Sequence, residues 1–217
     1  MNITTLASLG PGFSNEAFGS QAVFRAVLQA LSHPGRPVAV SHDADTPAAG
    51  HAASAAVLLA LLDSDCTLWL SPRLAAGDAA AWLRFHTGCT LVADPGDARF
   101  VWVGDGDALP QLSSLAQGTD IYPDQSATCV VDVERMDEVQ GGADAWCLTG
   151  PGIQHTAALR VAGVPDDFEH QWAANHDTFP RGVDVLLGTP NHIVGLPRTT
   201  RIARITPHPA ALHGAKA

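Results

Sequence analysis

The chain has 217 residues and a formal net charge of −10 at pH 7. That length suits one sizeable domain, and the acidic balance excludes nucleic-acid binding through a basic surface, which needs cations to displace phosphate counterions. Charged residues make up 16% of the chain and hydrophobic residues 46%, whereas about 25% of an ordinary soluble domain is charged. We therefore expect part of the surface to contact other subunits.

Three features of the sequence bear on the location of the protein. The first five residues carry no basic region typical of a secretory signal. The most apolar segment, 52–62, has eleven residues, fewer than the roughly 18 that a membrane span needs. The four cysteines lie in strand-like runs without CxxC spacing, which favours buried reduced thiols over a zinc site or a disulfide framework. We expect a soluble, cytoplasmic protein that makes no membrane contact.

In the first part of the chain, apolar spacing and turn residues predict three helices and several short strands. Apolar residues at steps of three to five predict a helix over 15–31, and His33-Pro34-Gly35 ends it. A buried helix is expected at 52–62, and Asp78 is the expected N-cap of a third helix that continues through His86. Strands are expected at 37–40, 66–70, 90–93 and 100–103.

The second part of the chain is richer in strands. We expect helices at 108–117 and 166–175, and a hairpin whose strands, 183–187 and 192–196, flank a four-residue connection. Further strands are expected at 128–133, 146–149 and 157–161. This succession predicts an α/β fold in which a mixed β-sheet carries helices on both faces.

The expected domain organisation is simple. A single α/β domain is expected over 14–205, after an N-terminal extension at 1–13. The segment 206–217 is rich in proline and alanine, and we expect it to be a frayed tail.

Three glycine clusters, Gly10-Pro11-Gly12, Gly104-Asp105-Gly106 and Gly150-Pro151-Gly152, raise the question of a phosphate loop. All three lack the spacing of a Walker loop or a dinucleotide fingerprint. The third follows a predicted strand and a threonine, which suits a tight turn near a ligand as well as a plain turn. The glycines alone therefore predict no nucleotide site.

No catalytic constellation is recognisable in the sequence. The histidine spacings do not match a zinc-binding HExxH helix, Ser14 is better explained as a helix cap than as a nucleophile, and the pairs of neighbouring aspartates fall in predicted turns. The only lysine, Lys216, lies in the expected tail, which excludes a pyridoxal-type Schiff base held in a pocket. We predict no catalytic residue, no metal ligand and no cofactor.

Arginine is the remaining candidate for binding an anion. Arg84 and His86 place a fixed cation beside a titratable group near the end of a predicted helix, where a charge interaction with the helix C-terminus is the competing interpretation. Arg198 and Thr199 follow the predicted hairpin and offer donors to phosphate or phosphonate oxygens. Ion pairing of Arg198 with one of the many aspartates and glutamates is an equally open interpretation. These four residues are our anion-binding candidates.

Seven short segments, taken in order, resemble the PhnH family, a subunit of the carbon–phosphorus lyase system. No single segment is specific, but their common order from Phe24 to Thr200 makes chance a poor explanation. The segments are Phe24-Arg25 with Ala30-Leu31-Ser32-His33-Pro34-Gly35, Leu61-Leu62-Asp63 with Thr67-Leu68-Trp69-Leu70, Leu83-Arg84-Phe85-His86-Thr87, Gly118-Thr119 with Pro123, Leu148-Thr149-Gly150-Pro151-Gly152-Ile153, Phe179-Pro180 with Gly182 and Asp184, and Leu196-Pro197-Arg198-Thr199-Thr200.

The resemblance to the PhnH family implies a fold, partners and a function that composition and motifs alone do not. It implies a single α/β domain similar to the pyridoxal-phosphate transferase fold without the cofactor, and a homodimer that joins PhnG, PhnI and PhnJ subunits. With these partners the family serves in making α-D-ribose 1-methylphosphonate 5-triphosphate from ATP and methylphosphonate, while the radical iron–sulfur chemistry belongs to another subunit. The alternative is a stand-alone enzyme that binds a small phosphate or phosphonate or transfers a phosphoryl or ribosyl group.

Overall fold

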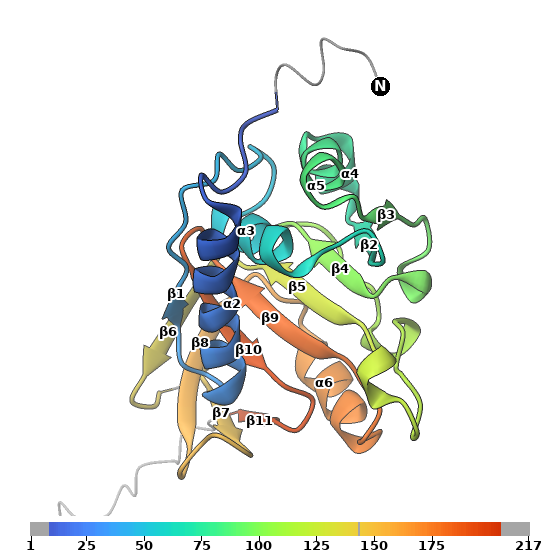
Figure 1. Ribbon diagram of the computed structural model, residues 1–217. Coiled ribbons are helices and arrows are strands. Elements are labelled where there is room, and N and C mark those ends of the chain that lie inside the picture. The colour runs from blue at the N-terminus through green and yellow to red at the C-terminus, as the bar shows by residue number, and fades with distance from the viewer. Residues whose placement is uncertain (1–8, 143, 205–217) are drawn as a thin grey trace, which may run out of the picture.

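The computed structural model describes residues 9–142 and 144–204, and its centre is a seven-stranded mixed sheet (Figure 1). The spatial order is β1-β10-β9-β5-β4-β2-β3, in which β10 runs antiparallel to both of its neighbours and the other adjacent pairs are parallel. The strands are β1 (Val38–Ala39), β2 (Thr67–Leu70), β3 (Thr90–Leu91), β4 (Phe100–Val103), β5 (Thr128–Asp132), β9 (Asp184–Gly188) and β10 (His192–Leu196).

A second, antiparallel sheet has the order β11-β7-β8-β6. Its strands are β6 (Arg135–Val139), β7 (Trp146–Thr149), β8 (Ala157–Ala162) and β11 (Arg201–Arg204). The helices are α2 (Glu16–Ser32), α3 (Ala52–Leu61), α4 (Pro72–Ala76), α5 (Ala79–Thr87) and α6 (Phe168–Asp177). The predicted mixed α/β fold is thus confirmed, but the strands divide between two sheets.

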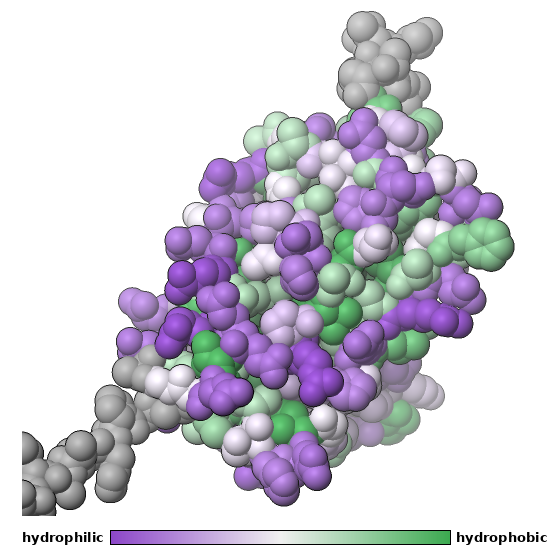
Figure 2. All heavy atoms as spheres, turned by 90° about the vertical axis from the view of Figure 1, so that its left-hand side faces the viewer, coloured by the Kyte–Doolittle hydropathy of each residue, from purple (hydrophilic) through white to green (hydrophobic). Residues whose placement is uncertain are grey.

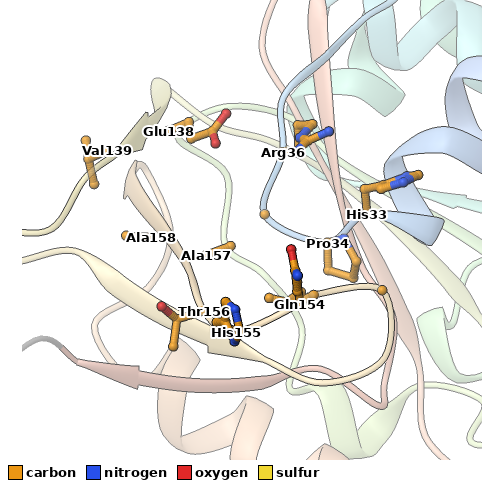
Figure 3. Close-up of a pocket in the computed structure, with 13 residues that line it drawn as sticks. His33, Pro34, Arg36, Glu138, Val139, Gln154, His155, Thr156, Ala157 and Ala158 are labelled. Atoms are coloured by element: carbon orange, nitrogen blue, oxygen red, sulfur yellow. The ribbon is translucent and has the colours of Figure 1, made fainter.

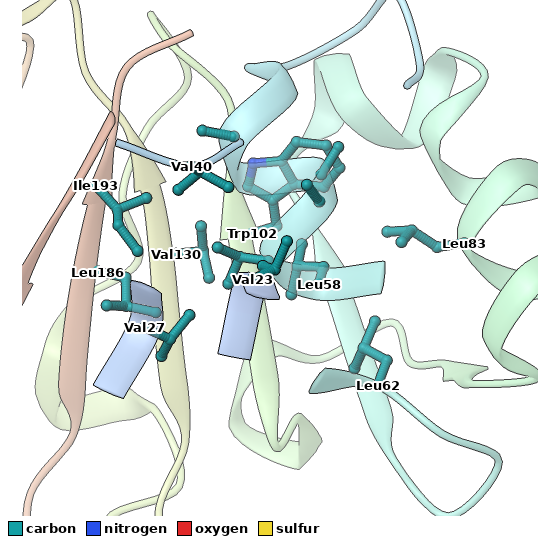
Figure 4. Close-up of a cluster of buried hydrophobic side chains, with 14 of the residues drawn as sticks. Val23, Val27, Val40, Leu58, Leu62, Leu83, Trp102, Val130, Leu186 and Ile193 are labelled. Carbon is teal, nitrogen blue, oxygen red and sulfur yellow. The ribbon is translucent and has the colours of Figure 1, made fainter. Parts of the chain in front are cut away.

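Side-chain alternation in the central strands gives the main sheet two buried faces. Trp102 and Val130 pack with Val23 of α2 and Leu58 of α3 (Figure 4). The intervening residues of the same strands point the other way, toward Trp172 of α6 and the smaller sheet. One face is therefore covered by helices and the other by a helix together with the second sheet.

The first helix shows how local chemistry sets its ends. Its N-cap is Asn15, whose side chain accepts a hydrogen bond from the backbone N–H of Phe18 at 3.1 Å, so the prediction of Ser14 as the cap is wrong. The Ser14 hydroxyl instead donates to the Asp43 carboxylate. At the other end His33 is the C-cap, as its position before proline predicted.

Other elements differ from the sequence prediction. The expected helix at 108–117 is reduced to a single 3₁₀ turn, Leu112–Ser114, in which the Gln171 side chain accepts from the backbone N–H of Leu112. Asp78 precedes α5 as expected but makes no capping hydrogen bond there. Its carboxylate accepts from the backbone N–H groups of Ala48 and Ala49, so it fastens the loop before α3 rather than the helix that follows it.

Three elements were missed, namely α4, β6 and β11. The expected tail at 206–217 and the first eight residues of the expected N-terminal extension lie outside the described residues. Within the described part of the chain, no helix combines the length and the apolarity needed to cross a membrane.

The cysteines give a direct test of burial. Cys129 is fully buried in β5, and burial raises the pKa of its thiol to about 12. The thiol therefore stays protonated at pH 8, and we expect iodoacetamide to leave Cys129 unmodified in the folded protein while the half-buried Cys66 and Cys147 react. Peptide mass spectrometry measures the labelling, and labelling in urea is the control. Rapid labelling of Cys129 without denaturant would contradict the buried position.

Candidate functional site

A cavity of about 300 Å³ lies where the end of α2 meets the smaller sheet. Three segments line it: the turn 33–36, Glu138 and Val139 on β6, and the segment 152–158, which leads from a turn into β8. Two of these segments belong to the stretches that resemble the PhnH family, around His33-Pro34-Gly35 and Gly150-Pro151-Gly152. The fold therefore brings together residues that are far apart in the sequence.

Glycine is required where the two turns touch. Gly152 has φ +83°, and a Cβ there would lie 2.2 Å from the carbonyl oxygen of Ser32 and 3.0 Å from Cδ of Pro34. Gly35 has φ +82°, and a Cβ there would lie 2.5 Å from Cδ1 of Leu148. Both positions combine a left-handed backbone with an approach too close for a side chain. At the floor of the cavity, Gly152 thus packs against the main chain of the turn that follows α2, and Gly35 packs against the side chain of Leu148.

Polar side chains surround this floor (Figure 3). Arg36 and Glu138 lie on one side, and Gln154, His155 and Thr156 lie on the other, with Gln154 pointing into the space between them. All five residues are exposed. The set supplies one fixed cation, one titratable ring, one carboxylate, an amide and a hydroxyl.

The hydrogen bonds leave several of these groups free for a ligand. Within the described residues, no hydrogen bond joins the side chains of Arg36, Gln154 or His155 to another protein group, whereas the Nδ1 atom of His33 lies 3.2 Å from the carbonyl oxygen of Gln29. A guanidinium group binds the oxygens of a phosphate or phosphonate through two parallel N–H donors. The cavity is therefore suited to a small anion.

The predicted anion-binding residues lie elsewhere. Arg84 and His86 lie in the last turn of α5, whereas Arg198 and Thr199 follow β10. Helix α5 lies at the top of the molecule in Figure 1, away from β10. The Nε2 atom of His86 lies 3.0 Å from the carbonyl oxygen of Gly10, so the ring fastens the segment before α2. Arg84 is exposed and lines a separate hollow with Cys89.

Arg198 is engaged by the protein itself. It pairs with Asp184 at 2.6 Å, and the side chain of Arg198 is only 11% exposed. Its remaining donors reach the carbonyl oxygens of Pro123 and Pro180 and the hydroxyl of Ser126. The backbone of the half-buried Thr199 packs against Gly150. The structure does not bring the four predicted residues into one site.

Arg36, Glu138 and His155 were missed as site residues. No spacing signal connects them, although Arg36 directly follows His33-Pro34-Gly35 and His155 follows the third glycine cluster. Across residues 9–142 and 144–204, no group of three or more His, Cys, Asp or Glu side chains is placed to hold a metal ion.

Comparison with known proteins identifies the family of this chain. A family model described as a bacterial phosphonate metabolism protein, PhnH, matches residues 11–203. The chain is 38% identical over 192 residues to the PhnH subunit of α-D-ribose 1-methylphosphonate 5-triphosphate synthase from Rhizobium meliloti (strain 1021), covering 88% of this chain and 94% of that protein. It is 33% identical over 186 residues to HtxG of Stutzerimonas stutzeri, named as a candidate C-P lyase subunit, with coverages of 84% and 85%. The chain therefore belongs to the PhnH family of bacterial phosphonate metabolism proteins.

Proposed function

We propose that this chain is a subunit of a carbon–phosphorus lyase complex. In that role it supports the formation of α-D-ribose 1-methylphosphonate 5-triphosphate from ATP and methylphosphonate. The observation that carries the proposal is the 38% identity to a synthase subunit over 94% of that protein's length. Because the family model matches residues 11–203, the match includes the segments that line the cavity as well as the core.

Genetic complementation tests the role. A phosphonate-utilising bacterium that lacks its own PhnH should regain growth on methylphosphonate as the sole phosphorus source when it expresses this chain. Growth on inorganic phosphate serves as the control. Failure to restore growth, with the protein present in soluble form, would contradict the proposal.

The proposed partners are a second copy of the chain and subunits of the PhnG, PhnI and PhnJ type, in the cytoplasm. The large hydrophobic side chains that are exposed in the described part of the chain are available for such contacts. They are Phe18, Phe24, Leu28, Phe85, Ile121, Tyr122 and Phe179. By contrast, the left-hand side of the molecule in Figure 1 is largely hydrophilic, with separate apolar side chains (Figure 2).

The similarity to the pyridoxal-phosphate transferase fold also remains our proposal. It is supported by the seven-stranded mixed sheet with helices packed on it. The only lysine of the chain is Lys216, so this member would use such a fold without a Schiff base to the cofactor.

Within the complex, we assign anion binding to the cavity around Arg36. Replacing Arg36 by glutamine removes a charge-assisted hydrogen bond, so we expect affinity for methylphosphonate to fall at least tenfold. Titration followed by ³¹P NMR measures this change. A second proposal for anion binding remains the set predicted from the sequence: Arg84, His86, Arg198 and Thr199.

A matched control tests whether the effect is specific to the cavity. Arg135 lies on β6 near Glu138 and is exposed in an ion pair with Asp137. Arg135→Gln makes the same change of charge outside the cavity and should leave the affinity unchanged. Equal losses in both variants would show a non-specific effect of net charge and contradict the assignment.

The alternative function is a stand-alone enzyme acting on a phosphate or phosphonate. Purified chain incubated with ATP and methylphosphonate distinguishes the two. We expect no product from the chain alone and product when the other subunits are added. Turnover by the isolated chain would favour the alternative.

A further inference from the structure

A second cavity, of about 380 Å³, lies at the carboxyl ends of the central parallel strands. Adjacent strands β2 and β4 send the chain in opposite directions there, since β2 leads to the edge strand β3 whereas β4 leads to β5. Such a switch point is the usual place for a ligand in an open α/β sheet, because the diverging connections leave a crevice. None of the four predicted anion-binding residues lines this cavity, and it shares no residue with the Arg36 cavity.

The cavity is lined by two carboxylates, an arginine and a histidine. Asp132 ends β5, Asp105 follows β4, Arg73 lies in α4, and His51 precedes α3. Arg73 is exposed, and one nitrogen of its guanidinium group donates to the carbonyl oxygen of Asp105 at 2.6 Å. The remaining guanidinium donors make no hydrogen bond within the described residues. The cavity thus combines a guanidinium group that has free donors with a buried carboxyl group.

Asp132 is the unusual member of this set, because it is only 1% exposed. One oxygen accepts from the backbone N–H of His51 at 2.8 Å, and the other accepts from the indole N–H of Trp102 at 3.1 Å. Both donors are neutral, as is the buried Ser54 hydroxyl that faces the same carboxylate, and an ionised carboxylate can accept about four hydrogen bonds. Burial raises the pKa of Asp132, since the charge loses its water. A positively charged partner in the cavity would stabilise that charge.

We propose that this cavity binds a small zwitterion, with its ammonium group facing Asp132 and its anionic group on Arg73. The identity of the anionic group rests on the proposed function, in which phosphonates are the substrates. Recognition of the ammonium group is assigned to Asp132, the buried one of the two carboxylates that line the cavity. An aminoalkylphosphonate carries both an ammonium group and a phosphonate group. An amino acid carries an ammonium group and, in place of the phosphonate, a carboxylate.

Calorimetry with three probes tests the proposal on the wild-type chain. The probes are 2-aminoethylphosphonate, ethylphosphonate, which lacks the amine, and β-alanine, which carries a carboxylate. We expect 2-aminoethylphosphonate to bind at least tenfold more tightly than ethylphosphonate, as a charge-assisted hydrogen bond predicts. Equal affinity for these two probes, or no binding of either at millimolar concentration, would overturn the proposal. Preference for β-alanine would keep the zwitterion site but contradict the role of phosphonates.

Two variants test the contact with the ammonium group and the contact with the phosphonate group separately. Asp132→Asn should abolish the preference for the amine, whereas Arg73→Gln should weaken 2-aminoethylphosphonate and ethylphosphonate alike. Arg135→Gln is the control and should change neither affinity. An amine preference that survives in Asp132→Asn would show that Asp132 serves only as a structural acceptor for His51 and Trp102, and would overturn the assignment.

Hydrogen exchange on the wild-type chain locates the ligand even if Asp132→Asn does not fold. Binding of 2-aminoethylphosphonate should slow exchange in the segments 48–51 and 104–107. Protection confined to 152–158 would place the ligand in the Arg36 cavity, which would overturn this inference while supporting the proposed function.

Discussion

Replacing Arg198 by methionine should lower the free energy of unfolding by about 3–5 kcal/mol. Methionine keeps much of the apolar length but removes the guanidinium group that pairs with Asp184 and holds the carbonyl oxygens of Pro123 and Pro180. The loss is large because the pair is mostly buried. Removing the guanidinium group leaves two carbonyl groups without their donor, and leaves the Asp184 carboxylate with the backbone N–H of residue 198 but without its charged partner. Urea denaturation followed by tryptophan fluorescence measures the change.

Arg181→Met is the matched control for this prediction. Arg181 pairs with Asp120 at 3.3 Å, but their side chains are 49% and 77% exposed. Exposed pairs contribute about 0–1 kcal/mol because water screens them and the side chains lose entropy. If the two variants lost equal stability, the structural role of Arg198 would be wrong and its sequence-based interpretation as an anion ligand would gain support.

Replacing Gly152 by alanine should cost about 3 kcal/mol or more and should also impair ligand binding in the Arg36 cavity. The new Cβ would lie 2.2 Å from the carbonyl oxygen of Ser32, which is main chain and has no rotamer to change. Backbone strain at positive φ adds to this overlap. Thermal unfolding measures stability, and ³¹P titration with methylphosphonate measures binding.

The variant Gly141→Ala distinguishes the effect of backbone strain at positive φ from the effect of steric overlap of a new Cβ. Gly141 also has positive φ, +116°, but nothing lies within 4 Å of a Cβ built there. That variant should lose only about 1 kcal/mol through the backbone preference and should bind methylphosphonate normally. Equal destabilisation of the two variants would contradict the close contact between the turns.

Strong apolar patterns made most of the central sheet predictable. The helix at 15–31 and the hairpin at 183–196 combine a buried face with clear turn residues, and the structure has both. β6 and β11 were missed because their residues are mostly charged and exposed, as in Arg135-Met136-Asp137-Glu138-Val139. Such a strand is stabilised by pairing with its neighbour rather than by its own propensity.

The site was harder to predict because its residues meet only through tertiary contacts. Sequence reasoning favoured a plain turn at Gly150-Pro151-Gly152 over a turn near a ligand, and could not show that this turn packs against His33-Pro34-Gly35. Likewise, the sequence identified Arg198 as a cation that follows the predicted hairpin. Whether that cation met a ligand or an aspartate depended on Asp184, which the register of β9 and β10 places beside it.

The main-chain contact between the two turns has a consequence for how ligand preference can change. A Cβ at Gly152 would meet the main chain of Ser32, so that part of the floor of the Arg36 cavity cannot accept a side chain, whereas a Cβ at Gly35 would meet the side chains of Leu148 and Ala157. The rim consists of exposed side chains, which can be exchanged at little cost to stability. A protein engineer could therefore alter the choice of anion through Arg36, Gln154 and Thr156 alone, while the fold beneath them stays untouched.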